Sequence, residues 1–132
     1  MIVVDTNVVA YLWLPGDMTA AAEQVLRQDA EWAVPLLWRS EFRSILIGAV
    51  RHKTVSIGRA TAIAAAAEDH LQHSEFAVDS ARVLALADSS GCSAHDSEFV
   101  SLATDLGVRL ITNNRAIIKA FPAIAIPLQQ FL

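Results

Sequence analysis

The chain has 132 residues, of which 54% are hydrophobic, with a mean hydropathy of +0.39 and a formal net charge of −4. This length predicts one domain spanning residues 1–132, and no apolar run approaches the roughly 18 residues that cross a bilayer. The negative charge argues against an ordinary nucleic-acid-binding protein. An enzyme that works with bound cations is exempt from that argument, because the cations offset its acids.

Cysteine usage and the start of the chain indicate the cellular compartment. Cys92 is the only cysteine, which excludes an internal disulfide and any zinc site built from several cysteines. The first residues show no basic stretch followed by an apolar run and a cleavage site, because a strand begins at residue 2. Both observations favour a cytoplasmic protein. The apolar excess predicts a surface buried against a partner.

Strand-like and helical patterns alternate along the chain. Short apolar runs indicate strands buried on both faces, and apolar residues three and four positions apart indicate helices. In chain order the predicted elements are strand 2–4, helix 7–12, helix 18–28, strand 32–34, helix 37–51, helix 56–69, strand 75–78, a helix capped by Asp79 and running to residue 87, a helix opened by Ser93 and ended by Gly107, strand 108–112, helix 115–120 and strand 123–126. This alternation predicts a three-layer α/β/α sandwich with a mostly parallel central sheet of four or five strands.

Three acidic residues stand at informative places in this pattern. Asp5 follows the first strand, Glu41 lies on the inner face of its helix, and Asp96 lies on the inner stripe near the start of another helix. In open α/β sheets, functional residues gather beyond the carboxyl ends of the strands. Converging buried carboxylates repel one another unless a cation joins them, and oxygen ligands without cysteine suit Mg²⁺ or Mn²⁺.

Each acid also has an explanation that needs no metal. Asp5 could cap the helix that follows it, and Asp96 has the spacing of a capping box with Ser93. Glu41 could pair with Arg39, Arg43 or another cation. The joint placement of the three acids beside the strand ends, rather than any one of them, favours the metal site.

Four motifs carry a resemblance to a known family. They are Val3-Val4-Asp5-Thr6-Asn7, Ser40-Glu41 inside an apolar helix, Ser93-Ala94-His95-Asp96 at the head of another, and Leu110-Ile111-Thr112-Asn113-Asn114-Arg115. In this order and at this spacing the chain resembles the PIN-domain nucleases over essentially its whole length. The closest likeness is to the VapC-like toxins of bacterial toxin–antitoxin pairs.

The resemblance implies a metal-dependent endoribonuclease that hydrolyses RNA phosphodiesters with metal-activated water. The residues matching the family's metal ligands are Asp5, Glu41 and Asp96, for Mg²⁺ or Mn²⁺. The Thr112 hydroxyl and the side chain of Thr6 or Asn7 would support the metal's water or the scissile phosphate. A cognate antitoxin protein and a homodimer are the implied partners, with a groove around helices 18–28 and 37–51 for a partner helix.

Asn114 departs from the family pattern, which carries an acid two residues after Thr112. An asparagine offers a metal one neutral oxygen but no negative charge for a second cation. We therefore expect one well-formed metal site and a weak second one. Lost activity is the other outcome, and it would leave a PIN-fold module that binds RNA or protein.

The remaining features have weaker functional interpretations. Arg43 and Arg115 are the basic residues nearest in sequence to the motifs and are predicted to contact RNA phosphates. The spacing of His70 and His73 suits zinc but lacks a third ligand, which favours an exposed helix end. The tryptophans could stack on bases, with core or interface packing as the default. They are Trp13, Trp32 and Trp38.

Three other enzyme classes fit the sequence poorly. A Rossmann domain needs a glycine-rich turn after the first strand, where Asp5-Thr6-Asn7 has no glycine, and a P-loop is also absent. An aspartyl nucleophile at Asp5 lacks a second acid two residues later, where Asn7 stands. A hydrolase triad of Ser93, His95 and Asp96 would crowd its members too closely in sequence for the required relay geometry.

Overall fold

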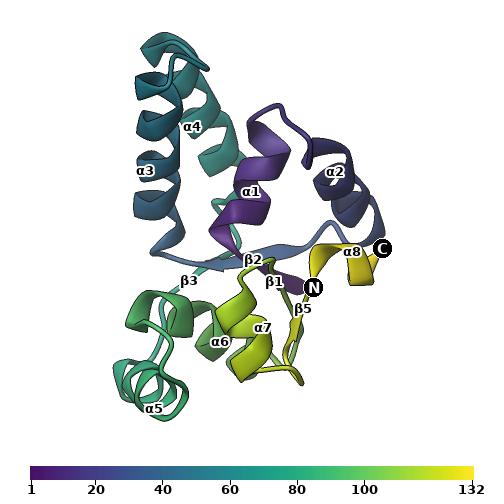
Figure 1. Cartoon of the computed structure of the whole chain (residues 1–132), viewed down its shortest axis with the longest axis vertical. Coiled ribbons are helices and arrows are strands. Elements are labelled where there is room, and N and C mark those ends of the chain that lie inside the picture. The colour runs from purple at the N-terminus through teal and green to yellow at the C-terminus, as the bar shows by residue number, and fades with distance from the viewer.

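Five strands form one parallel sheet in the computed structural model, which describes all residues from 1 to 132 (Figure 1). The strands lie in the spatial order β3-β2-β1-β4-β5, and every neighbouring pair is parallel. Their bounds are β1 (Ile2–Val4), β2 (Trp32–Pro35), β3 (Glu75–Phe76), β4 (Leu110–Ile111) and β5 (Ala125–Ile126). The predicted α/β fold is confirmed, with the N-terminal strand at the centre of the sheet.

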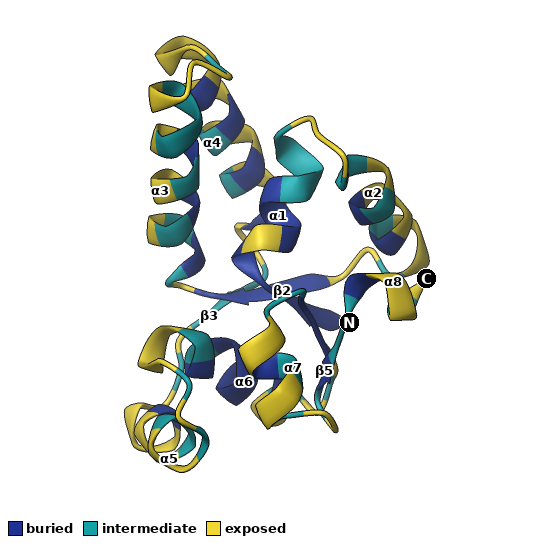
Figure 2. Ribbon diagram, viewed as in Figure 1, coloured by how far each residue is buried: buried dark blue, intermediate teal, exposed yellow.

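Helices cover both faces of this sheet (Figure 1). On one face lie α1 (Thr6–Trp13), α2 (Thr19–Gln28), α3 (Trp38–Arg51), α4 (Ile57–Leu71) and α8 (Leu128–Phe131). On the other face lie α6 (Ala94–Leu106) and α7 (Arg115–Ala120), with α5 (Ser80–Ser90) packed on α6. The α3–α4 hairpin extends beyond the sheet, and its tip is largely exposed (Figure 2).

Side chains of β1 alternate between the two layers. Ile2 and Val4 join the core cluster under α1 to α4, whereas Val3 joins the cluster under α6 and α7. All three are buried, as expected of a central parallel strand. Burying an aliphatic side chain of this size stabilises the fold by about 1.5–3 kcal/mol. The sheet centre, where Asp5 emerges, is therefore a rigid part of the molecule.

Predicted helix ends agree with the observed capping contacts. The side chains of Ser56, Asp79 and Ser93 each accept a hydrogen bond from a backbone N–H three residues later. Gly107 ends α6 in the left-handed conformation with φ of 65°, which favours glycine because a Cβ is strained there. These local signals position α6, and with it Asp96, relative to the sheet.

Several element predictions need correction. The short helix α8 was not expected, and β3, β4 and β5 have only two residues each because their flanking residues leave the ladder. The default of core packing is confirmed for Trp32 and Trp38, which are 2% and 0% exposed, so neither is available to stack on bases. Trp13 packs against the same core, and its ring meets the His70 ring edge-on, with 5.8 Å between the two ring centroids. None of the helices is long and apolar enough to span a membrane.

Candidate metal centre

Asp5 lies where β1 ends and α1 begins, at the carboxyl edge of the sheet. Its side chain is 8% exposed and makes no capping hydrogen bond to α1, although it occupies the cap position. Its Oδ2 instead accepts a hydrogen bond of 2.6 Å from the hydroxyl of Thr112, which follows the adjacent strand β4. Because β1 and β4 are parallel neighbours, their ends meet and bring these two side chains together.

Glu41 reaches the same edge from the first turn of α3. Its Oε1 accepts a hydrogen bond of 2.7 Å from the hydroxyl of Thr6, the first residue of α1. It forms no ion pair with Arg39, whose guanidinium binds Glu68 and Glu75 instead. The explanation of Glu41 as half of a structural ion pair is therefore wrong for Arg39.

Asp96 comes from the opposite layer, in the first turn of α6. Its backbone N–H donates to Ser93 Oγ at 3.0 Å, which is one half of the predicted capping box. Its carboxylate Oδ2 accepts a hydrogen bond of 3.3 Å from Asn114 Nδ2. The capping box thus explains the position of Asp96 in the helix, but its carboxylate contacts the turn that follows β4.

These three acids line one cleft of about 540 Å³. Its lining residues come from the start of α1, one face of α3, the start of α6 and the turn after β4, and they are Asp5, Thr6, Asn7, Leu37, Ser40, Glu41, Ser44, Ile45, His95, Asp96 and Asn114. No lysine or arginine lines the cleft. Three carboxylates therefore face a common space with one histidine, His95, and no lysine or arginine to neutralise them.

Burial and mutual repulsion act on these acids in the same direction. Burial raises the pKa of Asp5, and the charge of Asp96 adds to this, while the Thr112 hydroxyl and the nearby backbone N–H groups of Asn7 and Thr6 oppose it. Burial also raises the pKa of Glu41, with further increases from the charges of Asp5 and Asp96 and decreases from Thr6 and His95. Ionising either carboxylate in the folded protein therefore costs free energy, and a bound cation would offset that cost.

The carboxylates do not already surround a single point. Nowhere in the molecule do three acidic, histidine or cysteine side chains stand arranged to share one metal ion. Each acid is instead held by its own neutral donor, and the three donors are Thr112, Thr6 and Asn114. The donor chemistry still fits a hard divalent cation, because each carboxylate keeps a second oxygen and no competing ammonium or guanidinium group is present.

Two residues expected at the site have different contacts from those predicted. Thr112 is fully buried behind Asp5 and does not line the cleft, so its hydroxyl positions Asp5. The Oδ1 of Asn114 accepts hydrogen bonds from the backbone N–H groups of Ala116 and Ile117, at 3.0 and 3.2 Å, and caps α7. This oxygen is therefore engaged by two backbone donors, and a contact between Asn114 and a metal or its water shell stays a prediction.

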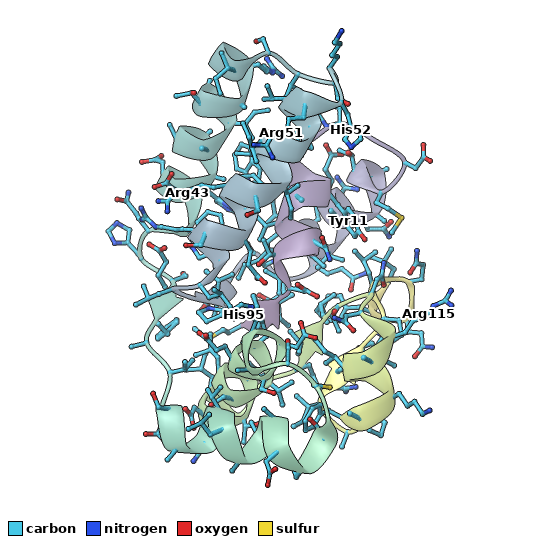
Figure 3. The ribbon with its side chains drawn as sticks, turned by 60° about the vertical axis from the view of Figure 1, so that its left-hand side comes forward. Tyr11, Arg43, Arg51, His52, His95 and Arg115 are labelled. Carbon is cyan, nitrogen blue, oxygen red and sulfur yellow. The ribbon has the colours of Figure 1, made fainter.

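The two arginines predicted to contact phosphate lie outside the cleft. Arg43 lines a separate apolar groove between α3 and α4, and Arg115 is exposed at the start of α7. Figure 3 shows Arg43 above His95 and Arg115 at the far right. Their contact with a substrate stays a prediction, and any such contact would lie away from the carboxylates.

Some cleft residues were not predicted. Ser44 and Ile45 share the face of α3 that carries Glu41, at helical spacings of three and four residues. That spacing was the available signal. His95 was predicted as part of the Ser93–Asp96 motif but given no role at the site. The triad weighed for it does not form, because Ser93 Oγ caps α6.

The fold and the cleft together define a class of protein: a parallel α/β domain with acidic residues gathered at the carboxyl edge of its central strands. The sequence profile of the PIN domain matches residues 2–122, and the chain belongs to this family. A solved structure described as a toxin–antitoxin complex from Klebsiella pneumoniae contains a chain of the same fold. The TM-score is 0.69 at 18% identity, over 97% of this chain and 98% of that one. None of the curated proteins compared matches the sequence.

Proposed function

We propose that this protein is a metal-dependent endoribonuclease in which Asp5, Glu41 and Asp96 bind Mg²⁺ or Mn²⁺. PIN domains are generally nucleases. The observation that carries the proposal is the convergence of three acids, from β1, α3 and α6, on one cleft that no lysine or arginine lines. A divalent cation bound there would offset charge on the attacked phosphate and lower the pKa of bound water.

The chain's own residues orient these acids and meet the substrate. The Thr112 hydroxyl donates a hydrogen bond to one carboxylate oxygen of Asp5, and the Thr6 hydroxyl donates one to a carboxylate oxygen of Glu41. The second oxygen of each carboxylate is free of these two bonds. Thr6 is 3% exposed, so it supports Glu41 and does not reach RNA. Asn7 is exposed and lines the cleft, so its side-chain amide is the group at the start of α1 that contacts a phosphate oxygen.

Cleavage of RNA by the purified chain tests this proposal. We expect cleavage with Mn²⁺ or Mg²⁺, none with excess chelator, and a loss of at least about 100-fold in Asp5→Asn and Glu41→Gln. Asp79→Asn is the matched control, because Asp79 is an exposed cap on α5 and asparagine caps equally well. Cleavage that persists with chelator, or in Asp5→Asn, would overturn the metal-nuclease assignment.

Asn114 supports a second candidate function, a PIN-fold module that binds RNA or protein and has weakened catalysis. The family's acid at this position is absent here, and the asparagine oxygen is committed to capping α7. RNA retention in a gel-shift assay, with no product after prolonged incubation in Mn²⁺, would favour this candidate over the nuclease.

We propose further that the protein is the toxin of a toxin–antitoxin pair, acts in the cytoplasm and forms a homodimer. The fold match to a chain of a toxin–antitoxin complex supports the first part. Induced expression should arrest growth, Asp5→Asn should not, and the product of a neighbouring gene should relieve the arrest. Light scattering after size exclusion measures the oligomeric state. Normal growth on induction of the unmodified chain would contradict the toxin assignment.

A further inference from the structure

The turn after β4 uses Asn114 in two ways at once. The side-chain oxygen caps α7 by accepting from the N–H groups of Ala116 and Ile117, and the side-chain nitrogen donates to Asp96 Oδ2 at 3.3 Å. This orientation of the amide is fixed by the cap. Reversing it would place the NH₂ group against two backbone N–H donors and leave an oxygen facing the Asp96 carboxylate.

The same turn also acts on Asp5. The backbone N–H of Asn114 donates to Thr112 Oγ1 at 2.9 Å, and Thr112 Oγ1 donates to Asp5 Oδ2 at 2.6 Å. Asp5 follows β1 and Asp96 lies on α6, so the two acids come from different layers of the fold. Asn114 is therefore linked to both of them, directly to Asp96 and through Thr112 to Asp5.

We propose that Asn114 is a positioning residue for Asp96. The side-chain amide N–H of Asn114 takes the place of a second cation, so that the cleft holds one divalent ion. This inference rests on the proposed function, because it concerns the same acids. The amide neutralises part of the charge on Asp96 Oδ2 and fixes that oxygen. The other carboxylate oxygen is then the one available to the ion, and no acid at position 114 is present to attract another.

An aspartate at position 114 would reverse this arrangement while keeping the helix cap. Aspartate caps helices as well as asparagine does, so one of its oxygens would still bind Ala116 and Ile117. Its other oxygen would stand against Asp96 Oδ2 at about the 3.3 Å now spanned by the hydrogen bond. Two carboxylates that close repel strongly unless a proton or a cation lies between them.

Mn²⁺ titration by calorimetry of the full chain and three variants tests the proposal. We expect one Mn²⁺ per unmodified chain and two per Asn114→Asp chain. Asn114→Ser keeps a capping side chain but is too short to reach Asp96, and it should bind one Mn²⁺ about tenfold more weakly. Asp79→Ala removes the cap of α5, a residue that does not line the cleft, and should bind Mn²⁺ as the unmodified chain does.

The possible results separate this inference from the proposed function. Two Mn²⁺ ions per unmodified chain, a single ion in Asn114→Asp, or unchanged affinity in Asn114→Ser would each overturn the positioning role while leaving a metal site in place. An equal loss of affinity in Asp79→Ala would also overturn it, since that loss would follow from general destabilisation. No Mn²⁺ binding by the unmodified chain would overturn the proposed function and this inference together.

Discussion

Replacing Asp5 by asparagine should stabilise the protein in the presence of chelator while abolishing its proposed activity. Asp5 is 8% exposed and faces Asp96, and burial raises its pKa. Asparagine has the same shape and keeps an oxygen for the Thr112 hydroxyl, so the substitution removes mainly the buried charge. Active-site groups are often held at a cost to stability in this way.

The size of the effect has an upper limit set by protonation. At pH 7 the folded protein would protonate Asp5 rather than tolerate a charge that costs more than about 4 kcal/mol, given an ordinary aspartate pKa near 3.9. The short hydrogen bond from Thr112 recovers part of the cost, since bonds to charged groups contribute about 1.5–3 kcal/mol. We therefore expect a stabilisation of about 1–2 kcal/mol, or roughly 4–8 °C in Tm for a domain of this size.

The difference in melting temperature between Asp5→Asn and the unmodified protein should depend on pH. Below the unfolded-state pKa, Asp5 is neutral in both states, and the two proteins should melt at nearly the same temperature. As the pH rises through that value toward the raised folded-state pKa, the unfolded chain ionises first, and the unmodified protein loses stability relative to Asp5→Asn. Thermal melts from about pH 3 to 8 with chelator, and with Asp79→Asn as control, measure the difference on both sides of the unfolded-state pKa.

Two results would refute this reasoning. Equal melting temperatures of the two proteins at every pH would mean that the Asp5 charge costs nothing in the folded state. A lower Tm for Asp5→Asn at pH 7 would mean that the charge is structurally stabilising. In a parallel series, Mn²⁺ at 100 times its Kd should raise the stability of the unmodified protein by about 2.7 kcal/mol and leave Asp5→Asn unchanged.

Three further predictions concern residues outside the cleft, each measured by denaturant or thermal unfolding. Ser101→Ala should be neutral or stabilise by up to about 1 kcal/mol, because the buried Ser101 hydroxyl has no hydrogen-bond partner; a loss above about 1 kcal/mol would contradict this. Glu75→Gln should cost about 1–2 kcal/mol at pH 7, because Arg39 and Trp38 bind this carboxylate. Hydrogen bonding from Arg39 lowers the pKa of Glu75, so this difference should shrink as the pH falls below about 4.5; a constant difference would refute it. Gly107→Ala should cost about 1 kcal/mol because of the positive φ, and an unchanged midpoint would show that the turn relaxes.

The fold was largely predictable because local and long-range signals agree in this chain. The run at residues 2–4 is apolar throughout, as a strand buried on both faces requires, and Gly107 and Asp79 mark helix ends through their own backbone and side-chain chemistry. The two-residue strands β3, β4 and β5 were predicted too long. A strand ends where its hydrogen bonds to the neighbouring strand end, even when apolar residues continue beyond that point.

The three acids of the candidate site were predictable, but its contacts were not. The order of strands and helices places Asp5, Glu41 and Asp96 at one edge, and it is this joint placement, rather than any single motif, that reveals them. Which atom of Asn114 faces Asp96 depends on the start of α7, since the cap decides the orientation of the amide. Likewise, the outward position of Arg43 depends on how α3 packs against α4, and sequence proximity to Glu41 does not reveal it.

The absence of Arg39 from the cleft follows from how α3 is arranged. Arg39 is only two residues from Glu41, but a two-residue step turns a helix by roughly 200°, so the two side chains leave the helix on different sides. Glu68 on α4 and Glu75 on β3 then bind the guanidinium on that other side. Arg39 therefore stabilises the contact of α3 with α4 and β3 without neutralising Glu41. Thr6, Thr112 and Asn114 hold the acids through neutral donors instead, which keeps three negative charges facing the cleft for a divalent cation to bind.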